Sequence, residues 1–196
     1  IMRQIIELAT RNQQKAWEII RQTDIENSWR STGADINLVG SLSMGLLMKH
    51  RDIDFHIYSS PVSLADDFRI MAKLAENPAI RKIEYANLLN ADEACLEWHA
   101  WYEDEEHELW QIDMIHLLKG SRYEGYFENV AKRIAALLTD EIKYAILKLK
   151  FETPETEKIM GIIYYQAVIQ GGVRTYTEFK EWIKQHPVSG IIEWIP

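Results

Sequence analysis

Residues 52–58 alternate between polar and large apolar side chains, and this pattern constrains the fold more than any other part of the chain. The apolar positions are Ile53, Phe55 and Ile57, and the polar ones begin with Asp52 and Asp54. Successive side chains of a β-strand point to opposite faces, so the pattern predicts a strand with one buried face. The two aspartates then project together from the other face.

The paired carboxylates indicate a metal site. Two neighbouring carboxylates repel each other unless a cation lies between them. Hard oxygen ligands suit Mg²⁺ or Mn²⁺, and a protein-bound Mg²⁺ usually takes further ligands from substrate phosphates. We therefore expect Asp52 and Asp54 to hold Mg²⁺ or Mn²⁺, with a nucleoside triphosphate as the donor substrate.

A glycine-serine pair, Gly40–Ser41, follows the short apolar segment 36–39. The segment predicts a strand, and the pair predicts the start of a helix that runs to about Leu47. Gly40 permits a close backbone approach, and Ser41 is a suitable helix cap. Free amide groups at a helix N-terminus bind anions, so the pair is a candidate for holding the phosphates of the nucleotide.

The order of strand, Gly-Ser, helix and Asp-x-Asp resembles the nucleotidyltransferase superfamily that includes DNA polymerase beta, and is most similar to its small bacterial members and antibiotic nucleotidyltransferases. The resemblance covers about the first 118 residues. It implies a third carboxylate on a later strand, where this chain has Asp113 in the segment 109–117. It further implies that Asp52, Asp54 and Asp113 are the catalytic, metal-binding residues.

Three rival motifs fit the sequence less well. A calcium-binding EF-hand loop starting at Asp52 requires glycine at its sixth and glutamate at its twelfth position, where the chain has Ile57 and Ser63. A Walker-type loop requires Gly-Lys-Ser or Gly-Lys-Thr, which is absent. An aspartyl phosphatase places the acidic pair after an apolar strand, whereas here the strand follows it. The remaining alternative is structural: a solvated strand entry, an ordinary helix cap and an isolated acid at Asp113.

The rest of the pattern predicts an α+β fold, with a mixed five-stranded nucleotidyltransferase-type sheet and flanking helices, followed by a C-terminal helical region. Helices are expected at 2–22, up to residue 31, and within 61–77; strands are expected at 80–86, 95–102 and 108–117. Four helices follow, at 123–138, 140–151, 154–170 and 175–185. We expect a catalytic domain at 1–118 and a helical extension at 119–196.

Composition narrows the class of protein. The chain has 196 residues, 47% of them hydrophobic, which is enough for a buried core. No apolar run is long enough to span a membrane, and a single cysteine, Cys95, excludes internal disulfides, so a reducing cytoplasm is expected. Residues 1–118 carry 11 basic and 20 acidic side chains, against 11 and 10 in residues 119–196. An acidic surface does not favour long nucleic acids.

The expected function is metal-dependent transfer of a nucleoside monophosphate from the triphosphate to a hydroxyl group of a small, antibiotic-like acceptor, with release of pyrophosphate. The alternatives are nucleotidylation of a protein partner, as in toxin-antitoxin systems, and a non-catalytic nucleotide-binding module. His56 and His116 are expected to be hydrogen-bonded residues beside the cleft, and Tyr164 and Tyr165 either line it or belong to the core. The sequence leaves the base, the acceptor and the oligomeric state open.

Overall fold

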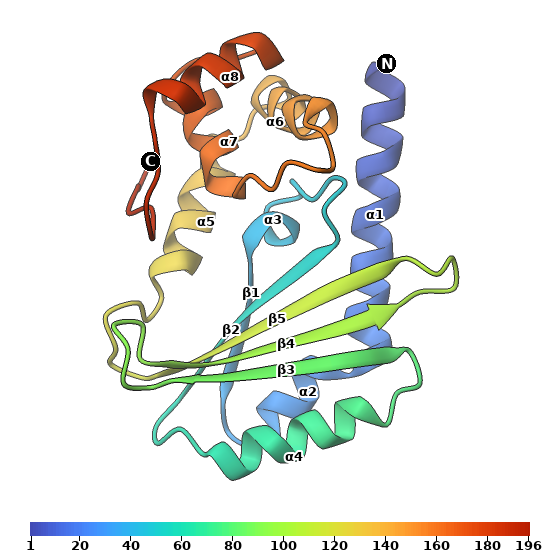
Figure 1. Ribbon diagram of the computed structural model, residues 1–196, viewed down its shortest axis with the longest axis vertical. Coiled ribbons are helices and arrows are strands. Elements are labelled where there is room, and N and C mark those ends of the chain that lie inside the picture. Colours follow the sequence, from blue (N-terminus) through green and yellow to red (C-terminus); the bar gives the residue numbers. More distant parts are fainter.

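A five-stranded sheet with the strand order β1-β2-β5-β4-β3 is the centre of the structure, a computed structural model that describes residues 1–196 (Figure 1). Strands β2 and β5 run parallel, and the other three pairs run antiparallel. The predicted mixed sheet with flanking helices is therefore confirmed. The strands are β1 (Asp35–Val39), β2 (Asp52–Ser59), β3 (Ile80–Leu88), β4 (Cys95–Glu103) and β5 (Leu109–Leu118).

The register between β2 and β5 decides where the candidate site residues meet. Asp54 lies directly beside Asp113 on the neighbouring strand, and Asp52 lies beside Gln111. Because paired residues of adjacent strands share a face of the sheet, the three aspartates project from the same face. The parallel pairing of β5 with β2 is what brings Asp113 to the motif strand.

The N-terminal helices cover the other face of the sheet. These helices are α1 (Met2–Thr23), α2 (Ile25–Arg30) and α4 (Leu64–Ala75). Ser63 caps the start of α4, and its side chain accepts a hydrogen bond from the Asp66 amide. A cluster of 22 buried residues fills the space between these helices and the sheet. Its largest members include Trp29, Trp98, Trp110 and Phe55. The apolar positions of the alternating strand 52–58 are thus core residues.

Four helices form the C-terminal part, above the site face of the sheet in Figure 1. They are α5 (Tyr126–Leu137), α6 (Asp140–Glu152), α7 (Gly161–Ile169) and α8 (Tyr176–Gln185). They enclose a second buried cluster of 12 residues, in which the rings of Tyr164 and Phe179 stack at 4.6 Å. Leu46, from the segment after the Gly-Ser pair, belongs to this cluster, so the helices are packed against the motif itself.

Two sequence predictions need correction. The helix after the Gly-Ser pair, α3, spans only Gly40–Ser43, because Gly45 takes a positive φ of 68° and the chain turns there. Ser41 does not cap this helix: Val39 is the N-cap residue and no side-chain cap bond forms.

The helix predicted at 154–170 begins only at Gly161. Pro154 starts a turn in which the Glu157 amide donates to the Pro154 carbonyl at 3.0 Å, and an extended segment follows. None of the helices combines the length and the apolar character needed to cross a membrane.

Candidate functional site

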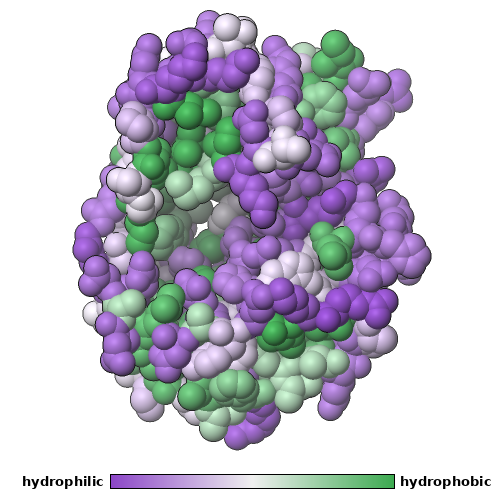
Figure 2. Space-filling model, viewed as in Figure 1, coloured by the Kyte–Doolittle hydropathy of each residue, from purple (hydrophilic) through white to green (hydrophobic).

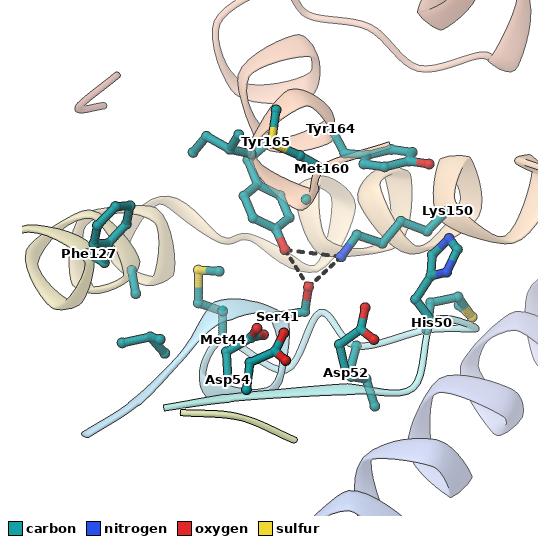
Figure 3. Close-up of a pocket in the computed structure, with 18 of the residues that line it drawn as sticks. Ser41, Met44, His50, Asp52, Asp54, Phe127, Lys150, Met160, Tyr164 and Tyr165 are labelled. Atoms are coloured by element: carbon teal, nitrogen blue, oxygen red, sulfur yellow. Dashed lines mark hydrogen bonds between the residues drawn. The ribbon is translucent and has the colours of Figure 1, made fainter. Parts of the chain in front are cut away.

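All five residues singled out in the sequence line one pocket of about 660 Å³ between the sheet and the C-terminal helices. They are Gly40, Ser41, Asp52, Asp54 and Asp113. Figure 2 shows the hollow near the centre of the molecule, with hydrophobic residues on its wall, and Figure 3 shows Asp52 and Asp54 pointing into it from β2. The structure thus brings the strand-borne acids and the Gly-Ser pair together.

Gly40 lies against the carboxylate of Asp54. A β-carbon added at Gly40 would be 2.2 Å from Asp54 Oδ2, and the backbone φ is +70°, a conformation that only glycine adopts without strain. Glycine at this position therefore allows the end of β1 to approach the side chain of β2. The approach that the structure shows at Gly40 is to the side chain of a candidate metal ligand, Asp54; an approach of phosphate to this backbone stays a prediction.

Burial and the mutual repulsion of the carboxylates both act on the acids of the pocket. Burial raises the pKa of Asp54 to about 7, with further contributions from the charges of Asp113 and Asp52, against which Lys150 acts. Asp52 stands at the exposed rim, yet partial burial in the pocket and the charge of Asp113 raise its pKa as well. A cation in the pocket would relieve this repulsion.

Asp113 is held in place by two neighbours. Its Oδ1 accepts a hydrogen bond from Gln111 Nε2 at 2.8 Å and lies 2.5 Å from His99 Nδ1 on β4. Burial lowers the pKa of His99, but the hydrogen bond and the charge of Asp113 outweigh burial, so the pKa is raised overall. Both hydrogen bonds use the same oxygen, which leaves Oδ2 of Asp113 for another partner.

The sequence did not point to Lys150, the cation nearest to the Gly-Ser pair. Its Nζ donates to Ser41 Oγ at 2.8 Å, to Tyr165 Oη at 3.0 Å and to the Leu46 carbonyl at 2.9 Å (Figure 3). Ser41 Oγ and Tyr165 Oη are themselves 2.8 Å apart. Lys150 is only 9% exposed. The sequence held one signal for this lysine. Lys150 follows Ile146 by four positions, so both residues lie on the same, buried side of the predicted helix 140–151.

The donor set suits a divalent ion in its chemistry. Asp52 and Asp54 offer carboxylate oxygens from one face of one strand, and their raised pKa values arise from burial and from negative charge that a cation would neutralise. No group of three or more His, Cys, Asp or Glu side chains is arranged to hold a metal ion in the structure. Asp52 and Asp54 are therefore the residues that fit, and Asp113 stands beside them.

The two histidines differ from expectation in different ways. His56 lines the pocket, where burial lowers its pKa to about 4 and its Nδ1 has no hydrogen-bond partner in the chain. His116 lies on the opposite, helix-covered face and is not beside the pocket. It bonds to Asp67 at 2.8 Å and to Ser59 at 2.5 Å, so it is a hydrogen-bonded core residue.

Helix α5 and the segment before α7 supply an apolar wall. Tyr164 and Tyr165 line the pocket and are also buried, so both expectations for these residues hold. The apolar side chains of α5 and of the segment before α7 include Phe127, Val130, Ile134 and Met160, and Met44, which follows α3, adds to the wall. The pocket therefore has an apolar part, here called the apolar lobe, beside these elements and a charged part at the sheet.

Comparison of the sequence with protein-family models and with curated proteins found no match. Solved structures do match. A structure of the Cid1 poly(U) polymerase, described as bound to MgATP, superimposes with a TM-score of 0.58 at 13% identity, over 85% of this chain and 54% of that one. A structure of the GLD-2–GLD-3 non-canonical poly(A) polymerase complex gives 0.54 at 10% identity, over 86% of this chain and 57% of the other.

A further Cid1 structure, described by its RNA terminal uridylyl transferase activity, gives a TM-score of 0.56 at 12% identity and covers 85% of this chain. The present chain spans little more than half the length of these neighbours. The chain therefore has the fold of the DNA polymerase beta-like nucleotidyltransferases.

Proposed function

We propose that this protein transfers a nucleoside monophosphate from a nucleoside triphosphate to an acceptor hydroxyl and releases pyrophosphate. The observation that carries the proposal is the position of Lys150, whose Nζ lies 2.8 Å from Ser41 Oγ in the pocket that Asp52 and Asp54 also line. In such a site the paired acids would bind the metal ion and the buried cation would bind the phosphates. The nucleotidyltransferase fold supports the same activity.

The phosphates would be held at the Gly-Ser end of the pocket. Ser41, Lys150 and Tyr165 together offer two hydroxyl groups and one ammonium group within 3.0 Å of each other. Charge-assisted hydrogen bonds from such donors to phosphate oxygens are strong. The apolar lobe along α5 and Met160 is available for the uncharged parts of the nucleotide or the acceptor.

Asp52 and Asp54 would hold Mg²⁺ or Mn²⁺. The bound ion supplies positive charge that polarises the phosphoryl group and lowers the pKa of the attacking hydroxyl. Two neighbouring structures are described with MgATP and MgGTP, which supports this choice of cofactor. In the chain itself, Lys150 is placed to stabilise negative charge on the outgoing pyrophosphate.

Asp113 is the candidate for receiving the acceptor proton. Its Oδ1 is fixed by His99 and Gln111, and its other oxygen is free of both bonds. In the proposed step the acceptor oxygen bonds to the α-phosphorus while the bond from that phosphorus to pyrophosphate breaks. The hydroxyl proton passes to Asp113 and then to solvent.

A small hydroxyl-bearing acceptor is our first choice. On the site face, Glu84 of β3 lies beside His99, which in turn lies beside Asp113, and Glu97 follows on β4. This acidic sheet face, on a chain of net charge −8, suits a neutral or cationic acceptor better than a polyanion. An RNA 3′ end is the second candidate, because the neighbouring proteins are described as RNA terminal uridylyl and poly(A) transferases.

The test is incubation of the purified chain with each labelled nucleoside triphosphate, Mg²⁺ or Mn²⁺, and either a panel of hydroxyl compounds or an oligoribonucleotide. Pyrophosphate release and the mass of the adduct identify the donor and the acceptor. Asp54→Asn should abolish turnover, and Asp66→Asn, a change on α4 outside the pocket, should not. Turnover that survives Asp54→Asn contradicts the mechanism. Tight nucleotide binding without turnover for any acceptor supports the non-catalytic alternative.

A further inference from the structure

Strand β3 forms a free edge of the sheet. The other edge, β1, has five residues, and helices α2 and α5 pack against it; helix α4 packs against β3 from the core face of the sheet. Strand β3 has nine residues, and only β4 pairs with it. Between Arg81 and Asn87 the backbone makes no hydrogen bond outside the ladder with β4. Alternate amide and carbonyl groups along this edge therefore lack a protein partner.

Exposed apolar side chains lie next to this edge. Phe68 on α4 is 48% exposed and Tyr85 on β3 is 36% exposed, and their rings are 5.2 Å apart. Leu64, one helical turn before Phe68, is 41% exposed. Figure 2 shows hydrophobic residues gathered at the lower end of the molecule, where Figure 1 places α4 and β3. Charged side chains, among them Arg81, Lys82 and Glu84, also lie on this edge strand, so only a partner strand of matching charge can pair with it.

We propose that two copies of this chain associate through antiparallel pairing of their β3 strands about a two-fold axis at Ile83. In a continuous antiparallel sheet the axis stands perpendicular to the sheet and lies midway between the two β3 strands. One residue of the strand therefore faces its own copy across the axis. With the axis at Ile83, Lys82 of each copy faces Glu84 of the other. Opposite charges directly across two strands stabilise the pair.

The charges select this register over its neighbours. An axis at Lys82 sets Lys82 against its own copy, and an axis at Glu84 does the same for Glu84. An axis at Tyr85 leaves both charges opposite uncharged residues, Leu88 and Ala86. Lys82 and Glu84 are both more than half exposed and already form an ion pair within one chain, so both reach the open edge. The β-bulge between Ile80 and Lys82 lies at the end of the overlap.

The pairing has a consequence for the candidate site. Glu84, His99, Asp113 and Asp54 lie in register on one face of the sheet. Because a two-fold axis perpendicular to the sheet keeps each face on its own side, the two pockets open on the same face of a ten-stranded sheet. Tyr85 and Phe68 lie toward the opposite face, beside the shared edge, where the second copy covers them.

Sedimentation velocity of the full chain over a wide concentration range tests the proposal. We expect a species of twice the 23.0 kDa chain mass. Lys82→Glu and Glu84→Lys should each raise the dimer dissociation constant about tenfold or more, because each variant places like charges opposite one another at two positions. The double exchange, Lys82→Glu with Glu84→Lys, should restore the wild-type dissociation constant. Lys132→Glu, which makes the same charge change on the exposed side of α5, should leave it unchanged.

Each outcome bears on the proposal. A monomer at all concentrations overturns it, and so does a dimer that the single exchanges leave intact, since that dimer uses another surface. Failure of the double exchange to restore association refutes the register at Ile83. Thermal unfolding monitored by circular dichroism confirms that each variant folds. Sedimentation is measured without nucleotide or acceptor, so its result does not depend on nucleotidyl transfer, and neither Lys82 nor Glu84 lines the pocket.

Discussion

Replacement of Gly40 by alanine tests the fit between the end of β1 and the Asp54 carboxylate. The new β-carbon would lie 2.2 Å from Asp54 Oδ2 and 2.9 Å from its carboxyl carbon, far inside van der Waals contact. The positive φ of 70° adds strain for any residue with a β-carbon. Asp54 must therefore turn away from its present rotamer, and the pocket loses a carboxylate in its proper place.

The structure offers a matched control for the size of the effect. Gly33 has a φ of 81° and open space where a β-carbon would lie, so Gly33→Ala introduces backbone strain alone. That strain costs about 1–2 kcal/mol. Displacing the Asp54 side chain adds about 0.5–1.5 kcal/mol, so Gly40→Ala should cost roughly 2–3 kcal/mol. For a chain of this size the melting temperatures should fall by about 3–6 °C for Gly33→Ala and by about 5–10 °C for Gly40→Ala.

Thermal unfolding and pyrophosphate release are the two assays. Gly40→Ala should lower turnover about a hundredfold, because a displacement of about 1 Å at a reacting centre has that effect, while Gly33→Ala keeps its activity. In an Asp54→Ala background the clash is absent, so the stability cost of Gly40→Ala should fall to that of Gly33→Ala. An equal cost of Gly40→Ala in both backgrounds, or full activity of the single variant, refutes the reasoning.

Three further changes separate the roles of charge and packing. Lys150→Met should lower pyrophosphate release about a hundredfold or more, because it removes the buried cation at Ser41. Lys148→Met on the same helix is the control. Equal rates of pyrophosphate release in the two variants would exclude this role for Lys150. The pKa of Asp54 is about 7 in the folded chain, against an ordinary value of 3.8, so the unfolded chain loses this proton first as the pH rises. In metal-free buffer the free energy of unfolding should therefore fall between about pH 4 and pH 7. Asp54→Asn should remove that part of the slope in a urea-unfolding series, and an unchanged slope would contradict the assignment. His116→Ala leaves Asp67, which is 0% exposed, without its imidazole partner and should cost about 3–5 kcal/mol in urea unfolding, with turnover per folded molecule retained; a cost below about 1 kcal/mol would show that the pair contributes little.

The strand-borne part of the site was predictable because strands have a simple period. Alternation in residues 52–58 placed Asp52 and Asp54 on one face, and the structure confirms that both side chains lie on the face of β2 that lines the pocket. Asp113 could not be placed by alternation, since its strand carries apolar residues on both faces. Its position came from the resemblance, and the register beside Asp54 then followed from the parallel pairing.

The helix-borne part was not predictable for a physical reason. Lys150 and Tyr165 are 109 and 124 positions from Ser41 in the chain, and only the packing of α6 and α7 against the segment after α3 brings them to it. No local period encodes such a meeting. The predicted helix through Leu47 failed for a local reason instead, because Gly45 adopts a positive φ and turns the chain toward the second core cluster.

The charge balance of the pocket leads to a last prediction. Asp52, Asp54 and Asp113 line it together with Lys49, Lys150 and Lys158, and Lys49 is engaged by the Thr153 carbonyl at 2.6 Å. A triphosphate brings several more negative charges to acids whose pKa values are already raised by burial and by their mutual repulsion. Binding of the nucleotide should therefore depend on a divalent ion.

Isothermal titration of a non-hydrolysable triphosphate analogue checks this dependence. The wild-type chain should bind it in Mg²⁺ and lose most of its affinity in a chelator, because the carboxylates then repel the phosphates. Replacing Asp52 and Asp54 together by asparagine removes that repulsion and leaves Lys150 in place. This variant should bind the metal-free analogue more tightly than the wild type does, although it cannot turn the substrate over. Equal affinity of the two proteins in chelator would show that the carboxylates do not face the phosphates.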